Sequence, residues 1–112
     1  MEPKTIQEIL ECLKAVDPYK VILFGSSVSG KPRADSDIDL LVVTKHEFIP
    51  KDFKQKNQIY LQVAKSLRTI EERIPIDLIV HTKGMHKRFM ELGSMFSKEI
   101  VDNGKVIYEE NN

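Results

Sequence analysis

Two aspartates spaced by one residue, with a third far along the chain, are the side chains best suited to chemistry. Asp37 and Asp39 open the apolar run of residues 37–43, and Asp77 lies near the start of the run of residues 76–80. Alternate residues of a strand share one face roughly 6.5–7 Å apart, so Asp37 and Asp39 can converge on a hard cation. Two bare carboxylates about 4 Å apart would repel by of order 4 kcal/mol at an effective dielectric near 20. This spacing predicts Mg²⁺, which favours carboxylate oxygens together with substrate phosphates.

A glycine–serine turn near these acids is a candidate phosphate-binding site. Gly25 and Ser26 directly follow the apolar run of residues 21–24. Gly25 lets a ligand approach the backbone because it has no Cβ. The Ser26 hydroxyl and the amides at a helix start can donate hydrogen bonds to an anion. A plain turn serine is the alternative interpretation of Ser26.

The third acid completes a site for nucleotidyl transfer if the strands at residues 37–43 and 76–80 are neighbours. Asp77 would then face the same pocket, and three carboxylates can hold two metal ions about 3.5–4 Å apart. One ion would bind the triphosphate of a nucleotide. The other would help to deprotonate an attacking hydroxyl, with Asp77 as ligand and base. Such in-line transfer depends mainly on positioning and charge neutralisation. Solvated, capping acids at strand ends are the alternative.

The elements that must position these residues alternate between strands and helices. Short apolar runs indicate strands, and apolar residues at helical spacing indicate helices. Thr5 and Glu8 have the form of a capping box, and Asp17-Pro18 ends the first helix. This order predicts an α/β fold with a small mixed β-sheet packed against helices. The expected strands are residues 21–24, 37–43, 76–80 and 106–108, and the expected helices are residues 5–17, 52–73 and 85–100, with Gly104 as the last C-cap.

Two further sets of residues each have two interpretations. One set is a locally basic run, either a solvated face or a contact for ATP phosphates or for an acidic partner patch. It comprises Lys45, Lys51, Lys54 and Lys56. The other set lies off the helical stripes and marks either a partner surface or a broad core. It comprises Leu61, Met90 and Met95.

Length and composition limit the classes of function. The 112 residues form a single expected domain, residues 1–112, and 17 basic side chains balance 17 acidic ones. A nucleic-acid partner is therefore not expected. Cys12 is the only cysteine, which excludes an internal disulfide, and His46, His81 and His86 show no metal-ligand spacing and are expected on loops or the surface. No apolar run reaches the roughly 20 residues of a membrane span, and no signal-peptide layout is present. We therefore expect a cytoplasmic protein without a membrane partner.

The combined motif resembles the nucleotidyltransferase superfamily that includes polymerase beta, and most closely its minimal (MNT) branch. That pattern is a Gly-Ser turn, a glycine four residues on, Ser-Asp-x-Asp-Leu, and a lone Asp on a later strand. The matching positions are Gly25, Ser26, Gly30, Ser36, Asp37, Asp39, Leu40 and Asp77. The resemblance covers nearly the whole chain and implies a polymerase-beta-like fold. Minimal members often carry Ala and a basic residue in the loop, where this chain has Ser27, Val28 and Ser29.

The resemblance implies an enzyme, a protein adenylyltransferase that uses ATP with two Mg²⁺ ions. Minimal members are commonly paired with a HEPN-domain ribonuclease toxin and silence it, as antitoxins, by transferring AMP to one of its tyrosines. The implied nucleotide-binding residues are Gly25, Ser26 and Ser36, and the implied metal-binding and catalytic residues are Asp37, Asp39 and Asp77. Two alternatives stay open. One is a catalytically weak, nucleotide-binding antitoxin that neutralises its partner by contact, and the other is nucleotidyl transfer to a small molecule or an RNA end.

Overall fold

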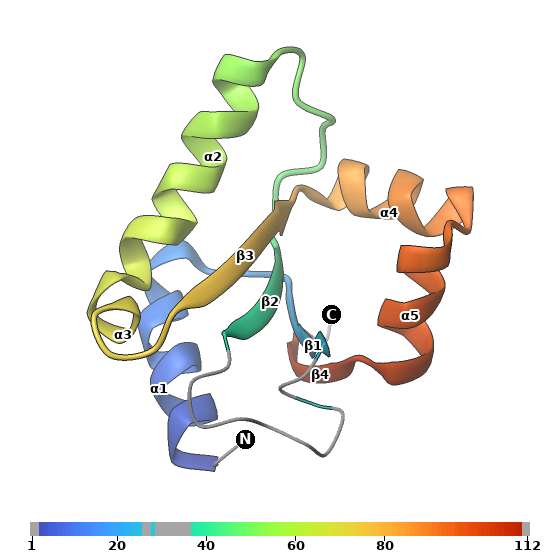
Figure 1. Cartoon of the computed structure of the whole chain (residues 1–112). Coiled ribbons are helices and arrows are strands. Elements are labelled where there is room, and N and C mark those ends of the chain that lie inside the picture. The colour runs from blue at the N-terminus through green and yellow to red at the C-terminus, as the bar shows by residue number, and fades with distance from the viewer. Residues whose placement is uncertain (1–2, 26–27, 29–36, 111–112) are drawn as a thin grey trace.

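One mixed four-stranded sheet forms the centre of the molecule, with strand order β3-β2-β1-β4 (Figure 1). The computed structural model describes residues 3–25, 28 and 37–110. β1 (Lys20–Phe24) is antiparallel to both β2 (Ile38–Val43) and β4 (Lys105–Glu109), whereas β3 (Ile76–His81) is parallel to β2. The predicted α/β fold with a small mixed sheet is therefore confirmed, as are its four strands to within two residues at each end.

The main core lies between one face of the sheet and the helices α1 (Pro3–Leu13) and α2 (Phe53–Ser66). In β2, Leu40 and Val42 point to this face, because alternate residues of a strand share a side. The buried residues of this core are Ile9, Leu13, Val21, Leu23, Ile38, Leu40, Val42, Ile59, Val63, Leu67, Ile70, Leu78 and Val80. This core fixes β2 and β3 side by side.

The opposite face of the sheet is covered by α4 (Lys83–Leu92) and α5 (Met95–Asn103), on the other side of the sheet from α2 (Figure 1). A smaller cluster of Ile22, Phe24, Leu41 and Ile100 is buried here. Leu41 belongs to this cluster while its neighbours in β2 belong to the main core, which confirms the predicted division of β2 into two faces.

The predicted start of the first helix and the predicted course of the second are wrong. Thr5 lies inside α1, which already includes Pro3, so Thr5 and Glu8 do not form an N-terminal capping box. The helix expected over residues 52–73 is interrupted at Leu67 and continues as the short α3 (Arg68–Glu71). Its start is as predicted, because the Asp52 side chain accepts a hydrogen bond from the amide of Gln55.

The third predicted helix is two helices, because the chain turns between α4 and α5. Gly93 has a φ of 59° and ends α4, and the Ser94 side chain then accepts a hydrogen bond from the amide of Ser97 to begin α5. Leu92, expected on the buried stripe, is 75% exposed as a result. Gly104 ends α5 as predicted, with its amide donating to the carbonyl of Ile100 over 2.9 Å.

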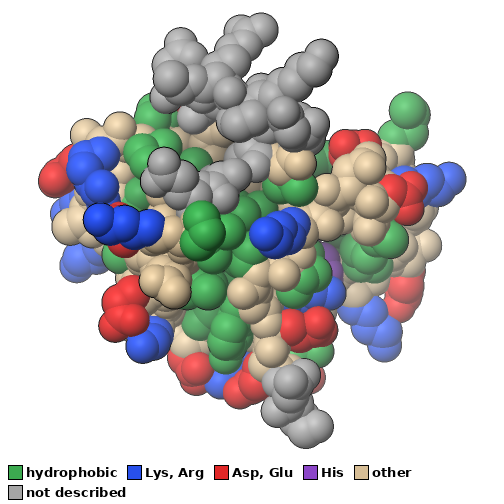
Figure 2. All heavy atoms as spheres, turned by 90° about the horizontal axis from the view of Figure 1, so that it is seen from below, with side chains coloured by type: hydrophobic (Ala, Val, Ile, Leu, Met, Phe, Trp, Pro, Cys, Tyr) green, Lys and Arg blue, Asp and Glu red, His purple; other side chains and the backbone are tan. Residues whose placement is uncertain are grey.

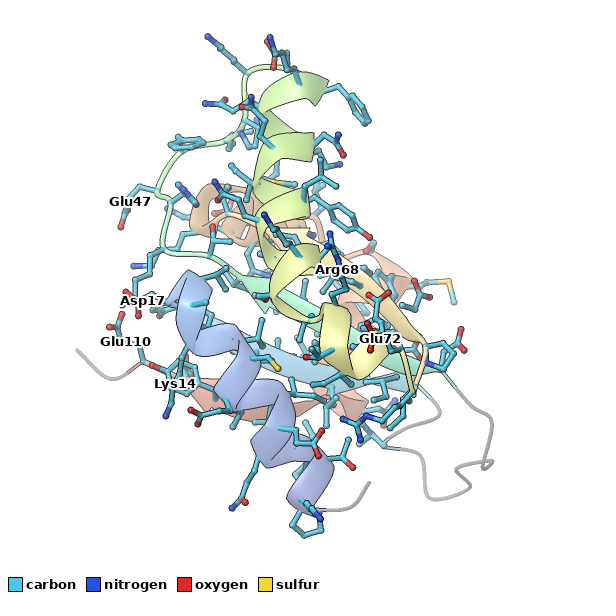
Figure 3. The ribbon with its side chains drawn as sticks, turned by 90° about the vertical axis from the view of Figure 1, so that its left-hand side faces the viewer. Lys14, Asp17, Glu47, Arg68, Glu72 and Glu110 are labelled. Carbon is cyan, nitrogen blue, oxygen red and sulfur yellow. The ribbon has the colours of Figure 1, made fainter. Side chains whose placement is uncertain are left out.

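An ion-pair cluster joins the end of the first helical segment to the end of β4. The 3₁₀ helix η1 (Lys14–Val16) continues α1 and ends at Asp17, whose φ is 47°. Nζ of Lys45 is 2.7 Å from Oδ2 of Asp17 and 2.8 Å from Oε1 of Glu110. Figure 3 shows Asp17 and Glu110 near one another on this side of the molecule. The amide of Glu110 also donates to the carbonyl of Tyr19, so this corner holds both β1 and β4.

Basic and acidic side chains are interspersed over the face shown in Figure 2, in keeping with the formal net charge of zero. Among the described residues, no helix is both long enough and apolar enough to cross a membrane.

Candidate functional site

Two of the three predicted acids lie side by side on adjacent strands. Asp39 of β2 is the register partner of Asp77 of β3. In a parallel pair, register partners point to the same face and their strands lie about 4.8 Å apart. That face is the one covered by α4 and α5, since Asp39 alternates with Leu40 of the main core. Asp39 is half-buried and Asp77 is exposed, so the pair opens to solvent at the start of both strands.

The backbone of Gly25 lies directly beside Asp39, one of the two residues of this acidic pair. β1 ends at Phe24, the register partner of Asp39, and the chain turns at once, with the amide of Val28 donating to the carbonyl of Gly25 over 3.1 Å. The φ of Gly25 is +70°, and an ideal Cβ at this position would lie only 2.2 Å from Oδ2 of Asp39. The absence of a side chain at Gly25 therefore lets the backbone pass directly beside the carboxylate.

The other predicted site residues are not gathered into this pair. Asp37 is exposed and precedes β2 by one residue, on the side of Asp39 by strand alternation. Ser26 and Ser36 lie outside the described residues. Within residues 3–25, 28 and 37–110, no three His, Cys, Asp or Glu side chains form a group that could hold a metal ion. The roles of Ser26, Ser36 and Asp37 stay predictions.

The donor set that is present fits Mg²⁺. Mg²⁺ in nucleotide sites is usually held by one or two carboxylates, with the remaining positions filled by water and phosphate oxygens. Asp39 and Asp77 supply two carboxylates on one face, and the Asp39 carboxylate lies against the backbone of Gly25, in the space that a Cβ there would need. These two acids are therefore the described residues that would hold the ion.

A row of aromatic rings, which the sequence did not reveal, extends across this face from the acidic pair. The ring of Phe24 meets that of Phe96 edge-on with centroids 5.5 Å apart, and Phe96 meets Phe89 in the same way at 5.7 Å. Phe89 lies 4.9 Å from the ring of His81 at the far end of β3. Edge-to-face contacts of this kind stabilise packing beyond the area they bury. They fix the α4–α5 hairpin over the sheet beside the acids.

His81 is buried, so its expected place on a loop or the surface is wrong. Its Nδ1 is 3.2 Å from Nδ1 of His86. Burial, together with the smaller effects of the charges of His86 and Lys56, lowers the pKa of His81 to about 4. Burial lowers the pKa of His86 as well. The sequence contained a signal for the position of His81. Strand alternation puts residue 81 on the same face of the strand as Asp77 and Ile79.

The comparisons with known proteins agree on one fold. The family model described as "Polymerase beta, Nucleotidyltransferase" matches residues 4–112. A toxin–antitoxin crystal structure with AMP-PNP is 20% identical, with a TM-score of 0.56, and the match covers 95% of this chain and 74% of that chain. A crystal structure of a toxin–antitoxin MntA–HpeT mutant is 18% identical, with a TM-score of 0.55 and the same two coverages of 95% and 74%.

A second MntA–HpeT mutant structure is 20% identical, with a TM-score of 0.52, and the match covers 94% of this chain and 72% of that chain. Likeness at this level of identity is a likeness of fold. A search of curated proteins gave no match.

Proposed function

Because the chain belongs to the polymerase beta nucleotidyltransferase family, we propose that it transfers AMP from ATP to a tyrosine hydroxyl of a HEPN-domain toxin. In this proposal it is the antitoxin of the pair. The observation that carries the proposal is the register of Asp39 and Asp77 beside Gly25. Two carboxylates and a side-chain-free turn on one face are the parts that a phosphate-bound Mg²⁺ requires.

Asp39 and Asp77 would hold Mg²⁺, which when bound supplies charge neutralisation at the phosphates. The acceptor oxygen would form a bond to the α-phosphorus while the bond to the bridging oxygen of the β-phosphate breaks, and pyrophosphate would leave. Asp77 would accept the hydroxyl proton on a carboxylate oxygen. Its exposure suits this role, because an acceptor carried by another protein must reach it from solvent.

The choice of ATP and of a toxin partner is supported by the solved structures that share the fold. One is a toxin–antitoxin structure with AMP-PNP, and two others are toxin–antitoxin MntA–HpeT mutants. The exposed Leu61 and Met95, at 53% and 89%, also favour a partner surface over a broad core at these two positions.

A second candidate function is neutralisation of the partner by contact, with nucleotide binding but without turnover. The observation that favours it is the metal donor set, because the described residues bring together a pair of acids and not three. Transfer to a small molecule or to an RNA end is a third outcome that the same experiment detects.

The test mixes the full chain with Mg²⁺, ATP labelled at the α-phosphate and a HEPN-domain toxin, in the presence of total RNA and a small-molecule extract of cells as competing acceptors. We expect label on a toxin tyrosine with the wild type and with Asp102→Asn, an exposed acid on α5 that serves as the control. Asp39→Asn and Asp77→Asn should each lower the rate on the order of 10²-fold or more. Equal neutralisation by all four proteins without label would establish the contact antitoxin instead. Label on RNA or on a small molecule would overturn the protein acceptor.

A further inference from the structure

A cavity of about 290 Å³ lies along the outer edge of β3, between α2 and α4. Four consecutive residues of the strand, Leu78–His81, line it, and the side chains of Phe53 and Tyr60 on α2 and Met85 on α4 form its walls. Figure 1 shows α2 and α4 diverging on either side of the end of β3. Consecutive strand residues point to opposite faces, so a cavity that touches all four of them runs along the backbone edge.

The backbone of β3 presents hydrogen-bonding groups to this cavity that have no backbone partner among the described residues. The carbonyls of Pro75 and His81 accept hydrogen bonds of 2.9 and 2.8 Å from amides at the two ends of β2. Odd-numbered residues of β3 therefore face β2, and the amides and carbonyls of Leu78 and Val80 point outward. In the part of the chain that the structure describes, β3 is the last strand of the sheet on this side. An open strand edge of this kind can pair with another strand.

The described part of the chain lines the cavity with one lysine and no acidic residue, although the whole chain is electrically balanced. The lysine lies on α2, which carries three lysines and no acid. Arg88 follows Met85 by three residues and so lies on the same side of α4. Of the lysine run noted in the sequence, Lys56 lines this cavity, which favours its interpretation as a contact for an acidic partner, whereas Lys45 pairs with Asp17 and Glu110.

We propose that an extended acidic segment of a protein partner binds along β3 as a fifth strand. Binding at this edge places a hydroxyl-bearing residue of the segment beside Asp77. β3 runs from Asp77 to His81 over about 13 Å, so a segment of about five residues spans both the cavity and the acid. In strand addition the main-chain hydrogen bonds provide affinity and the side pockets provide specificity. The transfer step of this proposal rests on the proposed function. The proposal adds that the acceptor segment is extended in shape and acidic in charge.

Hydrogen exchange of single amides tests the binding mode without ATP. The probe is a random copolymer of glutamate and tyrosine, and a copolymer of lysine and tyrosine is its control. We expect the glutamate copolymer to slow exchange at the outward amides of Leu78 and Val80 at least tenfold. The amide of Ile79, which faces β2, should not change. Unchanged exchange at Leu78 and Val80, or equal slowing by the lysine copolymer, would overturn the proposal.

Two other occupants of the edge have their own signatures in the same measurement. Slowing that appears without any copolymer and grows with protein concentration would assign the edge to a second copy of this chain. Displacement of the glutamate copolymer by an equal charge of single-stranded RNA, with the same amides protected, would assign it to nucleic acid. Either result would overturn the acidic protein segment.

A matched pair of variants isolates the backbone contribution. Val80→Pro and Val80→Ala both remove side-chain packing, but only the proline lacks the outward amide, and proline is tolerated on edge strands. Because both variants lose the same side chain from the cavity, we expect Val80→Pro to bind the glutamate copolymer at least tenfold more weakly than Val80→Ala does. A second pair, Lys56→Glu and Lys65→Glu on the same helix, tests the charge if Val80→Pro does not fold. Only Lys56→Glu should weaken binding; equal effects within both pairs would contradict the proposal.

Strand addition at the groove and the proposed adenylyl transfer can be contradicted independently of each other. Protection at Leu78 and Val80 without label on tyrosine, once labelled ATP and Mg²⁺ are added, would leave the groove standing and contradict adenylyl transfer. Label on tyrosine at equal rates in Val80→Pro and Val80→Ala would contradict the groove alone.

Discussion

Gly25 and Asp39 are in such close contact that residue 25 has no room for a side chain. An ideal Cβ there would lie 2.2 Å from Oδ2 and 3.0 Å from Cγ of Asp39, and the φ of Gly25 is +70°. The turn after β1 and the carboxylate of β2 therefore share one small space. A substitution at Gly25 should act on the position of Asp39 as well as on the backbone.

Gly25→Ala should lower both stability and activity. A left-handed φ costs an L residue roughly 1–2 kcal/mol, and forcing a methyl group into a filled space costs about 1–3 kcal/mol. We expect the free energy of unfolding, measured in urea, to fall by about 2–5 kcal/mol. The rate of label transfer should fall at least tenfold at a temperature where the variant is folded, because the carboxylate of Asp39 must move.

Gly93→Ala is the matched control for this variant. Gly93 also has a positive φ, +59°, but an added Cβ would meet nothing within 4 Å. We expect only the backbone cost, about 1 kcal/mol, and an unchanged transfer rate. If the two variants lost the same activity for the same loss of stability, the contact with Asp39 would have no functional meaning.

Mg²⁺ should stabilise the folded protein through Asp39 and Asp77. A ligand that binds only the folded state at ten times its Kd adds about 1.4 kcal/mol, which for a domain of this size raises Tm by roughly 5 °C. We expect this rise in the wild type and in Asp102→Asn and its loss in Asp77→Asn, measured by scanning calorimetry with Mg²⁺ and with EDTA. An equal rise in all three proteins would place the ion elsewhere.

The sequence was sufficient to place the acids on one face of the sheet. The period of two puts Asp39 opposite Leu40, and the buried clusters divide β2 in this way. Local patterns were enough here because strand alternation is a property of the backbone itself. The register of Asp39 with Asp77 required the full structure, since strand order depends on contacts between residues far apart in the sequence.

Helix ends could not be predicted from local patterns in the same way. Met85, Phe89 and Phe96 follow one helical stripe through Gly93, and a helix tolerates an isolated glycine. The turn at Gly93 forms because it brings Phe96 back against Phe24 and Phe89, a tertiary contact that no local pattern contains. Ser26 and Ser36 lie outside the described residues, so the phosphate-binding site predicted there stays a prediction.

Lys45 should stabilise the corner between η1 and β4 in a salt-dependent way. The hydrogen bonds that Lys45 donates to the carboxylates of Asp17 and Glu110 raise its pKa, so the ammonium stays charged across the usual pH range. Lys45→Met keeps the length of the side chain and removes the charge. We expect a lower Tm than that of the wild type at low salt. The difference should shrink near 1 M NaCl, where the Debye length is about 3 Å.

Lys98→Met, on the exposed surface of α5, is the control for this variant, since Lys98 forms no ion pair among the described residues. Its Tm should match the wild type at both salt concentrations. A Tm of Lys45→Met that stays equally low at both concentrations would mean that packing of its side chain, and not its charge, holds the corner.

The buried His81, beside the half-buried His86, should make stability fall as the pH drops from 6.5 to 4. The pKa of His81 lies near 4 in the folded protein, against 6.5 for an ordinary histidine, because burial disfavours its charged form. In this interval the unfolded chain binds a proton that the folded protein does not, so the free energy of unfolding rises with pH. The contribution of His81 is fully present above pH 6.5 and is lost as the pH falls toward 4.

His81→Phe removes this titration while keeping a ring beside Phe89, whose centroid is 4.9 Å from that of His81. Between pH 7.5 and pH 4.5, urea unfolding of the wild type should lose about 2–3 kcal/mol more than that of His81→Phe, since one pKa unit corresponds to about 1.4 kcal/mol. Carboxylates titrate in both proteins and cancel in the comparison. His46→Gln, at an exposed histidine outside the pair, should follow the wild type. Parallel curves for wild type and His81→Phe would show that His81 gains a proton in the folded protein as readily as in the unfolded chain.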